Sequence, residues 1–480
     1  MSDFSALISK YMKQSRVTGT ELADGTGLGK IVYKYIKGTR VPSCIDAVEK
    51  IADYLNMTYA DSLLLKDYWK NEHFGADRIA LWGQIDKFLK HFQITPVHSD
   101  VCLFEPNAFS HFPDKDMFYL NGDLNIHQAI LTLLSSVGDE PVYAVMQPDD
   151  SGLQECLIMA KKLNPSLEIF NIISLLPRTN GADSSIYNNL NLLHSVIPLT
   201  FASDTYHSYY YYSDGSIKEK WPLHASYIIT SRYALMFGNG DDSMSGIFSR
   251  DKNFIDDLHN NFTKMFQESR PLISLSTSPL SQMNLYYSTI QNKMISKRIQ
   301  FSMQPCLCPY LSQDLCSKYL NIDIPGSKKI VEVFLSNMDY YRNAMKSSTR
   351  EIISLAGIKR FLKTGRIDEL LDEFYNPLSV EDRVLVMQNW LESITPDSVS
   401  FLSSDAFPVQ YGLTITTTPS LFTTAFIYEN KVYTFYSEEP TITGTFWDYF
   451  SNIDERRFLP FEEGKRQLEE MINAKNPGIL

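Results

Sequence analysis

The stretch from residue 18 to residue 43, TGTELADGTGLGKIVYKYIKGTRVPS, constrains the fold more than any other part of this 480-residue chain. Thr18 is a residue type that caps the free amides of a helix, and a short segment of helical composition follows it. Gly27 stands where the chain must turn, because glycine adopts a positive φ without steric cost. Gly38 ends a second helical segment in the same way, and Pro42 begins a third. The pattern therefore predicts two short helices joined by a glycine turn.

Charge is distributed unevenly along the chain. Residues 1–45 contain seven Lys and Arg against three Asp and Glu, a net charge of +4, whereas the whole chain carries −12. The remaining residues therefore carry −16. This balance excludes a wholly basic protein that coats nucleic acid. A small cationic head on an acidic body suits a protein that touches phosphate groups at one end only.

The residues of this head fall in register with a known pattern, and the region resembles the XRE family of Cro/C1-type helix-turn-helix regulators. The matching residues lie on both predicted helices, in the turn and in the segment that follows: Leu22, Ala23, Gly27, Leu28, Gly38, Arg40, Pro42, Ser43, Ile51, Ala52 and Leu55. The match covers only residues 4–65. The resemblance implies an all-α domain over residues 1–70, whose second motif helix, residues 29–37, enters the major groove of double-stranded DNA.

The resemblance and the charge pattern together predict which residues contact DNA. The expected set is Thr18, Thr20, Lys30, Ile31, Val32, Lys34, Lys37, Thr39 and Arg40. The cationic side chains are placed to meet phosphates or base edges. Ile31 and Val32 either pack on thymine methyl groups or belong to the core, and the sequence leaves both alternatives open. Tyr33 and Ile36 are expected on the inner side of the second helix.

Three positions depart from the family pattern. Gly19 stands where the family usually has a Gln that braces a phosphate, and Gly29 replaces the usual polar residue after the turn. Lys37 replaces a Glu. These differences remove groups that read bases and add positive charge. The sequence therefore predicts DNA binding better than it predicts a sequence preference. A degenerate head that makes only protein contacts is the alternative.

The rest of the chain predicts a larger α/β (α+β) body, so the expected fold class is multidomain. We expect a helical linker over residues 71–100, an α/β sensor-like domain over 101–270, and a helical segment with a β-rich end over 271–480. Residues 141–177 predict strand, helix and strand, which is typical of a parallel pair. Residues 225–237 predict one strand, 271–325 an irregular segment, and 328–392 mainly helix. We identify no internal repeat.

No catalytic or metal-binding pattern stands out in the body. Cys306, Cys308 and Cys316 form a cluster without a nearby His, which favours ordinary reduced thiols over zinc ligands or a redox switch. The nine histidines are scattered, and neither a nucleophile elbow nor a nucleotide fingerprint occurs. We therefore expect no enzyme activity, no metal and no cofactor. No signal peptide or membrane-spanning run is identified, so we expect a cytoplasmic protein.

Taken together, these features predict a DNA-binding transcriptional regulator. Its body is expected to hold a homodimer, since two heads can bind two half-sites of a duplex. The body is also expected to sense a small-molecule or protein effector, with a pocket at a strand end suggested by analogy to other α/β folds. Two alternatives remain open: an enzyme that its head targets to DNA, and a protein-interaction scaffold with a degenerate head.

Overall fold

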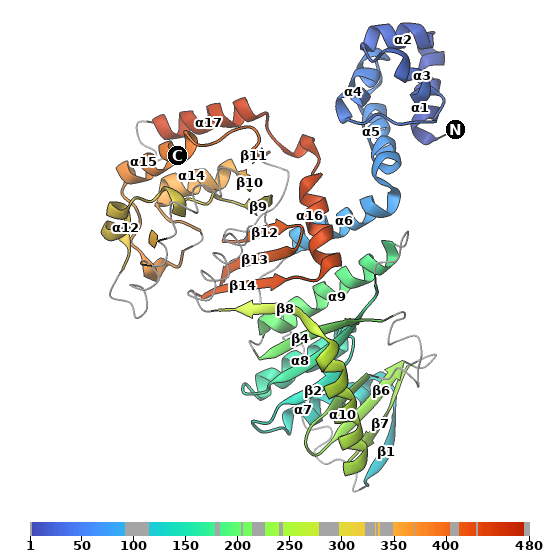
Figure 1. Ribbon diagram of the computed structural model, residues 1–480, viewed down its shortest axis with the longest axis vertical. Coiled ribbons are helices and arrows are strands. Elements are labelled where there is room, and N and C mark those ends of the chain that lie inside the picture. The colour runs from blue at the N-terminus through green and yellow to red at the C-terminus, as the bar shows by residue number, and fades with distance from the viewer. Residues whose placement is uncertain are drawn as a thin grey trace. The chain divides into compact units, whose positions relative to one another are not determined.

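The computed structural model is a multidomain α+β protein with two compact units, unit 1 (Met1–Asp86) and unit 2 (Lys87–Leu480) (Figure 1). The structure describes residues 2–91, 115–177, 183–202, 205–213, 226–239, 243–277, 297–321, 332, 335–336, 349–368, 370–403, 412–428 and 431–474. The predicted boundary at residue 70 falls inside a helix of unit 1. The predicted boundary at residue 270 falls inside unit 2.

Unit 1 is all-helical. Its elements are α1 (Asp3–Ser15), α2 (Gly19–Thr26), a 3₁₀ turn η1 (Gly29–Ile31), α3 (Val32–Ile36), α4 (Ile45–Tyr54) and α5 (Tyr59–Phe74), followed by α6 (Ala76–His91), which crosses the division between the units. Ser2, Thr18 and Thr58 each cap a helix by accepting a backbone N–H with the side-chain oxygen. The predicted helices are confirmed. In the predicted helical linker over residues 71–100, the described residues 71–91 are helical apart from a break at Gly75, whose φ is +91°.

The helices of unit 1 enclose one apolar core. Its members recur at helical spacing on α1, α2, α4 and α5 and include Phe4, Ile8, Leu22, Val48, Ile51 and Leu65, all of them buried. The Trp69 indole donates a hydrogen bond to the Pro42 carbonyl oxygen at 2.8 Å, which fastens the α3–α4 connection to α5. The short helices α2 and α3 are thereby held by burial, because helices this short are unstable alone.

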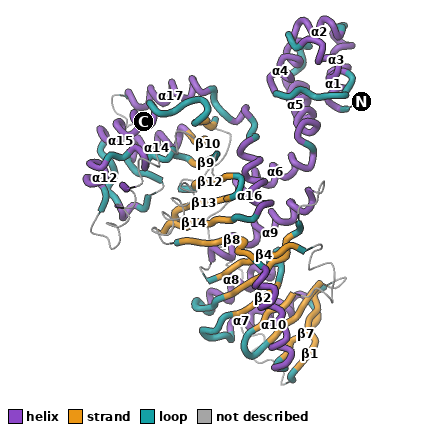
Figure 2. Tube along the Cα trace, viewed as in Figure 1, coloured by secondary structure: helices purple, strands orange, loops and turns teal. Residues whose placement is uncertain are grey.

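Unit 2 contains one continuous 14-stranded sheet (Figure 2). Its strand order is β1-β7-β6-β5-β2-β3-β4-β8-β14-β13-β12-β9-β10-β11. The strands are β1 (Met117–Asn121), β2 (Val142–Val145), β3 (Ile169–Leu175), β4 (Tyr206–Tyr212), β5 (Ser226–Ile229), β6 (Ala234–Asn239), β7 (Met244–Ser249), β8 (Arg270–Ser276), β9 (Arg298–Ser302), β10 (Thr349–Ser354), β11 (Val399–Leu402), β12 (Thr414–Thr418), β13 (Leu421–Tyr428) and β14 (Lys431–Ser437). The predicted parallel pairing of β2 with β3 is confirmed.

The sheet is an internal duplication. Repeat 1 has the order β1-β7-β6-β5-β2-β3-β4, and repeat 2 has the order β8-β14-β13-β12-β9-β10-β11, with each strand in the equivalent place. In both repeats the three strands at one end are parallel, and every other neighbouring pair is antiparallel. The repeats join through β4 and β8, which pair antiparallel. Repeat 2 therefore runs opposite to repeat 1, and the sequence-based expectation of no internal repeat is wrong.

Short sequence matches accompany the shared topology. Met-Gln-Pro follows the first parallel strand of each repeat, at residues 146–148 and 303–305. Ile-Ile-Ser-Leu lies at the end of the second, at residues 172–175 and 352–355. These identities stand at equivalent places in the sheet, as a duplication predicts.

Two local hydrogen-bond motifs are also repeated. In the β5–β6 turn the Thr230 hydroxyl accepts the N–H groups of Arg232 and Tyr233 and donates to the Tyr233 carbonyl. In the β12–β13 turn Thr418 makes the same three hydrogen bonds, with Ser420 and Leu421. The first of these turns shows that the single strand predicted for residues 225–237 is a hairpin. Strands β12 and β13 form a second hairpin.

A second motif closes the antiparallel part of each repeat. Ser249 accepts the N–H of Asp251, which caps the next helix, and Ser437 accepts the N–H of Glu439, which does the same.

The helices lie on the two faces of the sheet. The connecting helices are α7 (Asp123–Ser135), α8 (Ser151–Leu163), α9 (Asp183–Ala202), α12 (Gln313–Tyr319), α14 (Leu355–Thr364) and α15 (Val380–Leu391); α10 (Lys252–Glu268) and α16 (Pro440–Ser451) are equivalent helices after β7 and β14, and α17 (Phe461–Asn473) ends the described chain. Helix α10 packs on β2 and β5, and α16 packs on the equivalent strands β9 and β12.

Two regional predictions are corrected by these strands. The segment 271–325, expected to be irregular, contributes β8 and β9, and the mainly helical segment 328–392 contains β10. Polar residues on β9 and β10, Arg298, Gln300 and Glu351, are buried and hide the apolar signal of a central strand.

Candidate nucleic-acid interface

Helix α2 begins at a capping box. The Thr18 hydroxyl accepts the Glu21 N–H at 3.3 Å, and the Glu21 carboxylate accepts the Thr18 N–H at 2.7 Å. The Thr18 N–H and the Thr18 hydroxyl, which donates to the Glu21 carboxylate at 2.8 Å, hold the pKa of Glu21 below its ordinary value. Gly27 ends the helix with a φ of +69°, as its sequence position predicted. The start and end of α2 therefore follow from local chemistry.

The second helix is shorter and less regular than predicted. It starts as the 3₁₀ turn η1 at Gly29, whose φ of +65° favours glycine, and continues as the five-residue α3. Gly38, which follows the end of the helix, has a φ of +67°. A Cβ atom at Gly38 would lie 2.8 Å from the Ser5 hydroxyl oxygen, so this exit packs closely against α1.

The residues that this helix turns toward the core precede the expected ones, Tyr33 and Ile36, by one position. Val32 and Tyr35 are buried in the core of unit 1, whereas Tyr33, expected inside, is 39% exposed. Val32 is fully buried and unable to reach a groove, so it is removed from the predicted DNA-contacting set. Ile31 is half-buried and packs against the same core, which favours the core alternative for this residue too.

The outer face carries a row of cations around one aromatic residue. Lys30, Tyr33, Lys34 and Lys37 are exposed and follow the i, i+3, i+4, i+7 spacing of one helix face. Because these positions are neighbours on a helix surface, the three ammonium groups gather on one side of unit 1. This row is called the α3 face below.

Tyr33 is a candidate contact residue that the sequence reading missed. Its hydroxyl lies 2.8 Å from the Thr20 hydroxyl oxygen, and a Cβ atom on Gly19 would lie 2.8 Å from its ring. The Tyr33 ring thus occupies the space that the usual Gln side chain would need at position 19. The signal was available, since residue 33 shares its helix face with the three lysines.

Thr39 and Arg40 extend the cationic surface beyond the helix. Both are exposed, and the Thr39 backbone N–H donates to the Lys34 carbonyl oxygen at 3.0 Å, which fixes the exit of the chain. Within the described part of the chain, no carboxylate forms a salt bridge with Lys30, Lys34, Lys37 or Arg40. These charges therefore remain available to an external anion. Thr18 and Thr20 are exposed at the start of α2.

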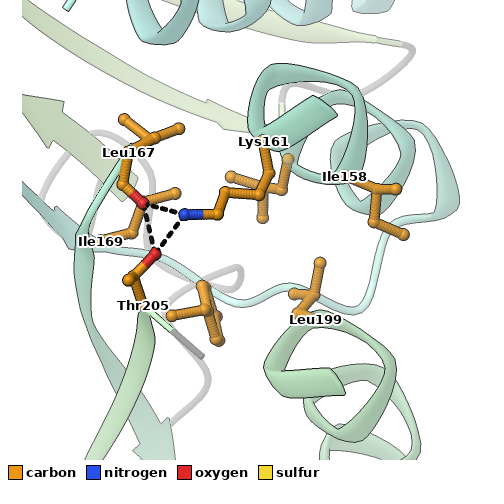
Figure 3. A pocket seen from close by; sticks show the side chains of 8 residues that line it. Ile158, Lys161, Leu167, Ile169, Leu199 and Thr205 are labelled. Atoms are coloured by element: carbon orange, nitrogen blue, oxygen red, sulfur yellow. Dashed lines mark hydrogen bonds between the residues drawn. The ribbon is translucent and has the colours of Figure 1, made fainter. Parts of the chain in front are cut away.

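The described residues of unit 2 show no comparable site. Cys306, Cys308 and Cys316 are buried, and no three potential metal ligands gather in this part of the chain. A small pocket lies beside the amino ends of β3 and β4, where the Lys161 ammonium donates to the Leu167 carbonyl oxygen at 2.8 Å (Figure 3). Its cavity of about 10 Å³ holds roughly one water.

Comparisons with known proteins show no family for this chain. No protein-family model and no curated protein matches it. The solved structures it is similar to include TrmBL2, an archaeal chromatin protein described with a novel mode of DNA binding (9% identity, TM-score 0.25, 45% of this chain and 72% of that one). They also include polyphosphate kinase from Porphyromonas gingivalis (10%, 0.24, 77% and 59%) and the phospholipase D family member Nuc from Salmonella typhimurium (12%, 0.21, 32% and 97%). Similarity this low supports no functional inference.

The helices were also compared with the requirements for crossing a membrane. In the ranges that the structure describes, no helix has both the length and the apolar composition needed to cross a bilayer.

Proposed function

We propose that this protein binds double-stranded DNA through the α3 face and Arg40, and that it is a transcriptional regulator of the XRE helix-turn-helix type. The observation that supports this most is the set of four exposed cations, Lys30, Lys34, Lys37 and Arg40, without a carboxylate partner among the described residues. Such charges neutralise phosphates and release counterions, which is the main source of affinity for a duplex.

The charge distribution of unit 1 also supports DNA binding through the α3 face. Residues 46–86 hold four basic and eight acidic residues, a net −4 that balances the +4 of residues 1–45. Unit 1 is therefore neutral as a whole but strongly polarised. A duplex would be attracted by residues 1–45 and repelled by residues 46–86, which favours docking through the α3 face.

The proposed binding is weakly sequence-selective. Gly19 and Gly29 offer no side chain to a base edge, and the Tyr33 hydroxyl is already engaged by Thr20. The remaining contacts are mostly long, flexible cations that suit phosphates. We further propose that the protein acts as a homodimer in the cytoplasm, and that any effector acts on unit 2.

A double variant tests the proposal. In Lys34→Ala/Arg40→Ala, two phosphate contacts are lost, so the affinity for a mixed-sequence duplex should fall by roughly 10- to 100-fold, and the dependence of log K on log salt should flatten by about 2. Fluorescence anisotropy of the full-length chain with a labelled duplex measures both quantities.

The matched control is Lys359→Ala/Lys363→Ala. It removes two exposed lysines from α14 in unit 2, within the basic stretch GIKRFLKTGR. This control should bind as the wild type does. Equal binding by the wild type and by Lys34→Ala/Arg40→Ala would overturn the proposal, and selective loss in the α14 variant would move the interface to unit 2.

A further inference from the structure

The two edges of the 14-stranded sheet are finished differently. At the β11 edge, residues 457–459 lie alongside the strand: Ser403 N–H donates to the Arg457 carbonyl at 2.9 Å, and Leu459 N–H donates to the Phe401 carbonyl at 2.8 Å. Helix α17 also packs on β11. Residues 452–473, which follow the last element shared by the repeats, therefore cover this edge, as proteins commonly do to prevent pairing with another chain.

The β1 edge has no such cover among the described residues. Arg250 N–H donates to the Asp116 carbonyl, and Gly122 N–H donates to the Met244 carbonyl. These two bonds show that the even-numbered residues of β1 form the hydrogen-bonded pairs with β7. The backbone groups of the even residues therefore face β7. Those of Met117, Tyr119 and Asn121 face outward. Among the described residues, the only hydrogen bond to these outward-facing groups comes from the Asn125 side chain, which donates to the Asn121 carbonyl.

The side chains of this edge are not those of a protected strand. Met117 is 49% exposed and Tyr119 is 65% exposed. The strand MFYLN contains no proline and no lysine, the residues that ordinarily protect an exposed edge. An aromatic side chain on an open edge strand instead favours cross-strand pairing.

The duplication shows how this edge is used elsewhere in the same sheet. Strand β8 is the equivalent of β1 in repeat 2, and its equivalent edge is paired antiparallel by β4. The same architecture thus accepts an antiparallel strand at this place. In repeat 1 the described residues supply none.

We propose that β1 pairs antiparallel with β1 of a second copy of this chain, with Tyr119 on the two-fold axis. In this register Tyr119 faces Tyr119 of the second copy, and Met117 faces its Asn121. Each facing pair exchanges two backbone hydrogen bonds, because these are the residues whose backbone groups point outward.

Symmetry limits this pairing to two copies. A two-fold axis makes the interface self-complementary and closes it at two copies, whereas the covered β11 edge prevents growth at the far end of the sheet.

This inference rests on the homodimer in the proposed function and names the surface that forms it. Its test uses no nucleic acid, so its failure would leave the DNA-binding proposal untouched. The full-length wild type is centrifuged at sedimentation equilibrium from about 1 to 100 μM, a range suited to a small interface. The expected mass rises from that of the 55.0 kDa chain to twice that value.

Charge variants at the two-fold axis give the specific readout. Tyr119→Lys and Tyr119→Glu each place like charges opposite one another, so each alone should sediment as a monomer. Their equimolar mixture should dimerise again, because Lys then faces Glu. The control Tyr59→Lys makes the same change at a tyrosine that is 82% exposed on α5 and should dimerise normally.

The recovered dimer in the mixture also shows that both variants are folded. A wild type that stays monomeric throughout, as it would if another part of this chain covered β1, overturns the proposal. So does a dimer that persists in both single variants, or a mixture that stays monomeric although circular dichroism shows both variants folded.

Discussion

The two repeats of unit 2 share their strand order, their Met-Gln-Pro turns and their threonine-closed hairpins, yet equivalent residues perform different tasks where the repeats meet. Asp251 and Glu439 both cap the helix that follows the antiparallel strands. Asp251 is exposed, whereas Glu439 is completely buried beside β4 of the other repeat. Local turn chemistry has been kept in both copies. The contacts that join one copy to the other are among those that differ.

Glu439 is the centre of this junction. Its carboxylate accepts hydrogen bonds from the Tyr212 hydroxyl on β4 and from the Thr441 hydroxyl at 2.6 Å, in addition to the N–H groups of Thr441 and Ile442. The Asn189 amide on α9 extends the network by donating to the Thr441 hydroxyl at 3.1 Å. Burial and the Glu439 carboxylate raise the pKa of Tyr212 far above its ordinary value, so its proton stays in this contact.

The largest expected effect in unit 2 comes from removing this carboxylate. Glu439→Ala leaves several buried donors without an acceptor and should lower the free energy of unfolding by roughly 3–5 kcal/mol. Asp251→Ala removes an exposed cap and should cost about 1 kcal/mol. Urea unfolding of both variants, followed by circular dichroism, measures the difference. Equal losses would show that the junction contributes no more than a surface cap.

A smaller difference between the repeats concerns their equivalent glutamines. Gln147 donates to the Ser174 carbonyl, and its own side-chain carbonyl has no partner in the described part of repeat 1. Gln304 donates to the Arg366 carbonyl and also accepts the N–H of Asp368. The Asp368 side chain is buried beside Arg360, and burial outweighs that guanidinium and raises the pKa of Asp368 to about 6.

This carboxyl group makes repeat 2 sensitive to pH. A folded-state pKa above the ordinary 3.8 means that the stabilisation is complete below pH 4 and is lost as the pH rises through 6. The loss is about 3 kcal/mol, from roughly 1.4 kcal/mol per pKa unit. We expect the unfolding free energy of the wild type, relative to Asp368→Asn, to fall by this amount between pH 4 and pH 7 in urea titrations. A difference independent of pH would contradict the raised pKa.

The sequence predicted unit 1 far better than unit 2, and the physical reason is the range of the interactions. The cap at Thr18, the glycine turn at Gly27 and the exit at Gly38 depend on residues within a few positions of one another. The error at Tyr33 is also local: a five-residue helix is too short for its apolar period to fix the inner face, so Val32 and Tyr33 were exchanged.

The duplication in unit 2 depends on contacts between distant segments. Its matching signals are three or four residues long and lie more than 150 positions apart, at 146–148 and 303–305 or at 172–175 and 352–355. The spacing between signals differs in the two repeats, so no fixed period appears. Strand order is decided by pairing across the sheet, which short strands of mixed polarity do not encode locally.

The central claim, that the α3 face of unit 1 neutralises the phosphates of a duplex, is tested most directly by the salt dependence of DNA binding. The measurement is the affinity of the full-length wild type for one mixed-sequence duplex between about 50 and 300 mM salt. Four exposed cations without a carboxylate partner among the described residues predict a slope of log K against log salt of about −3 to −4 for each bound head. No binding at the lowest salt, or a slope near zero, would contradict the account.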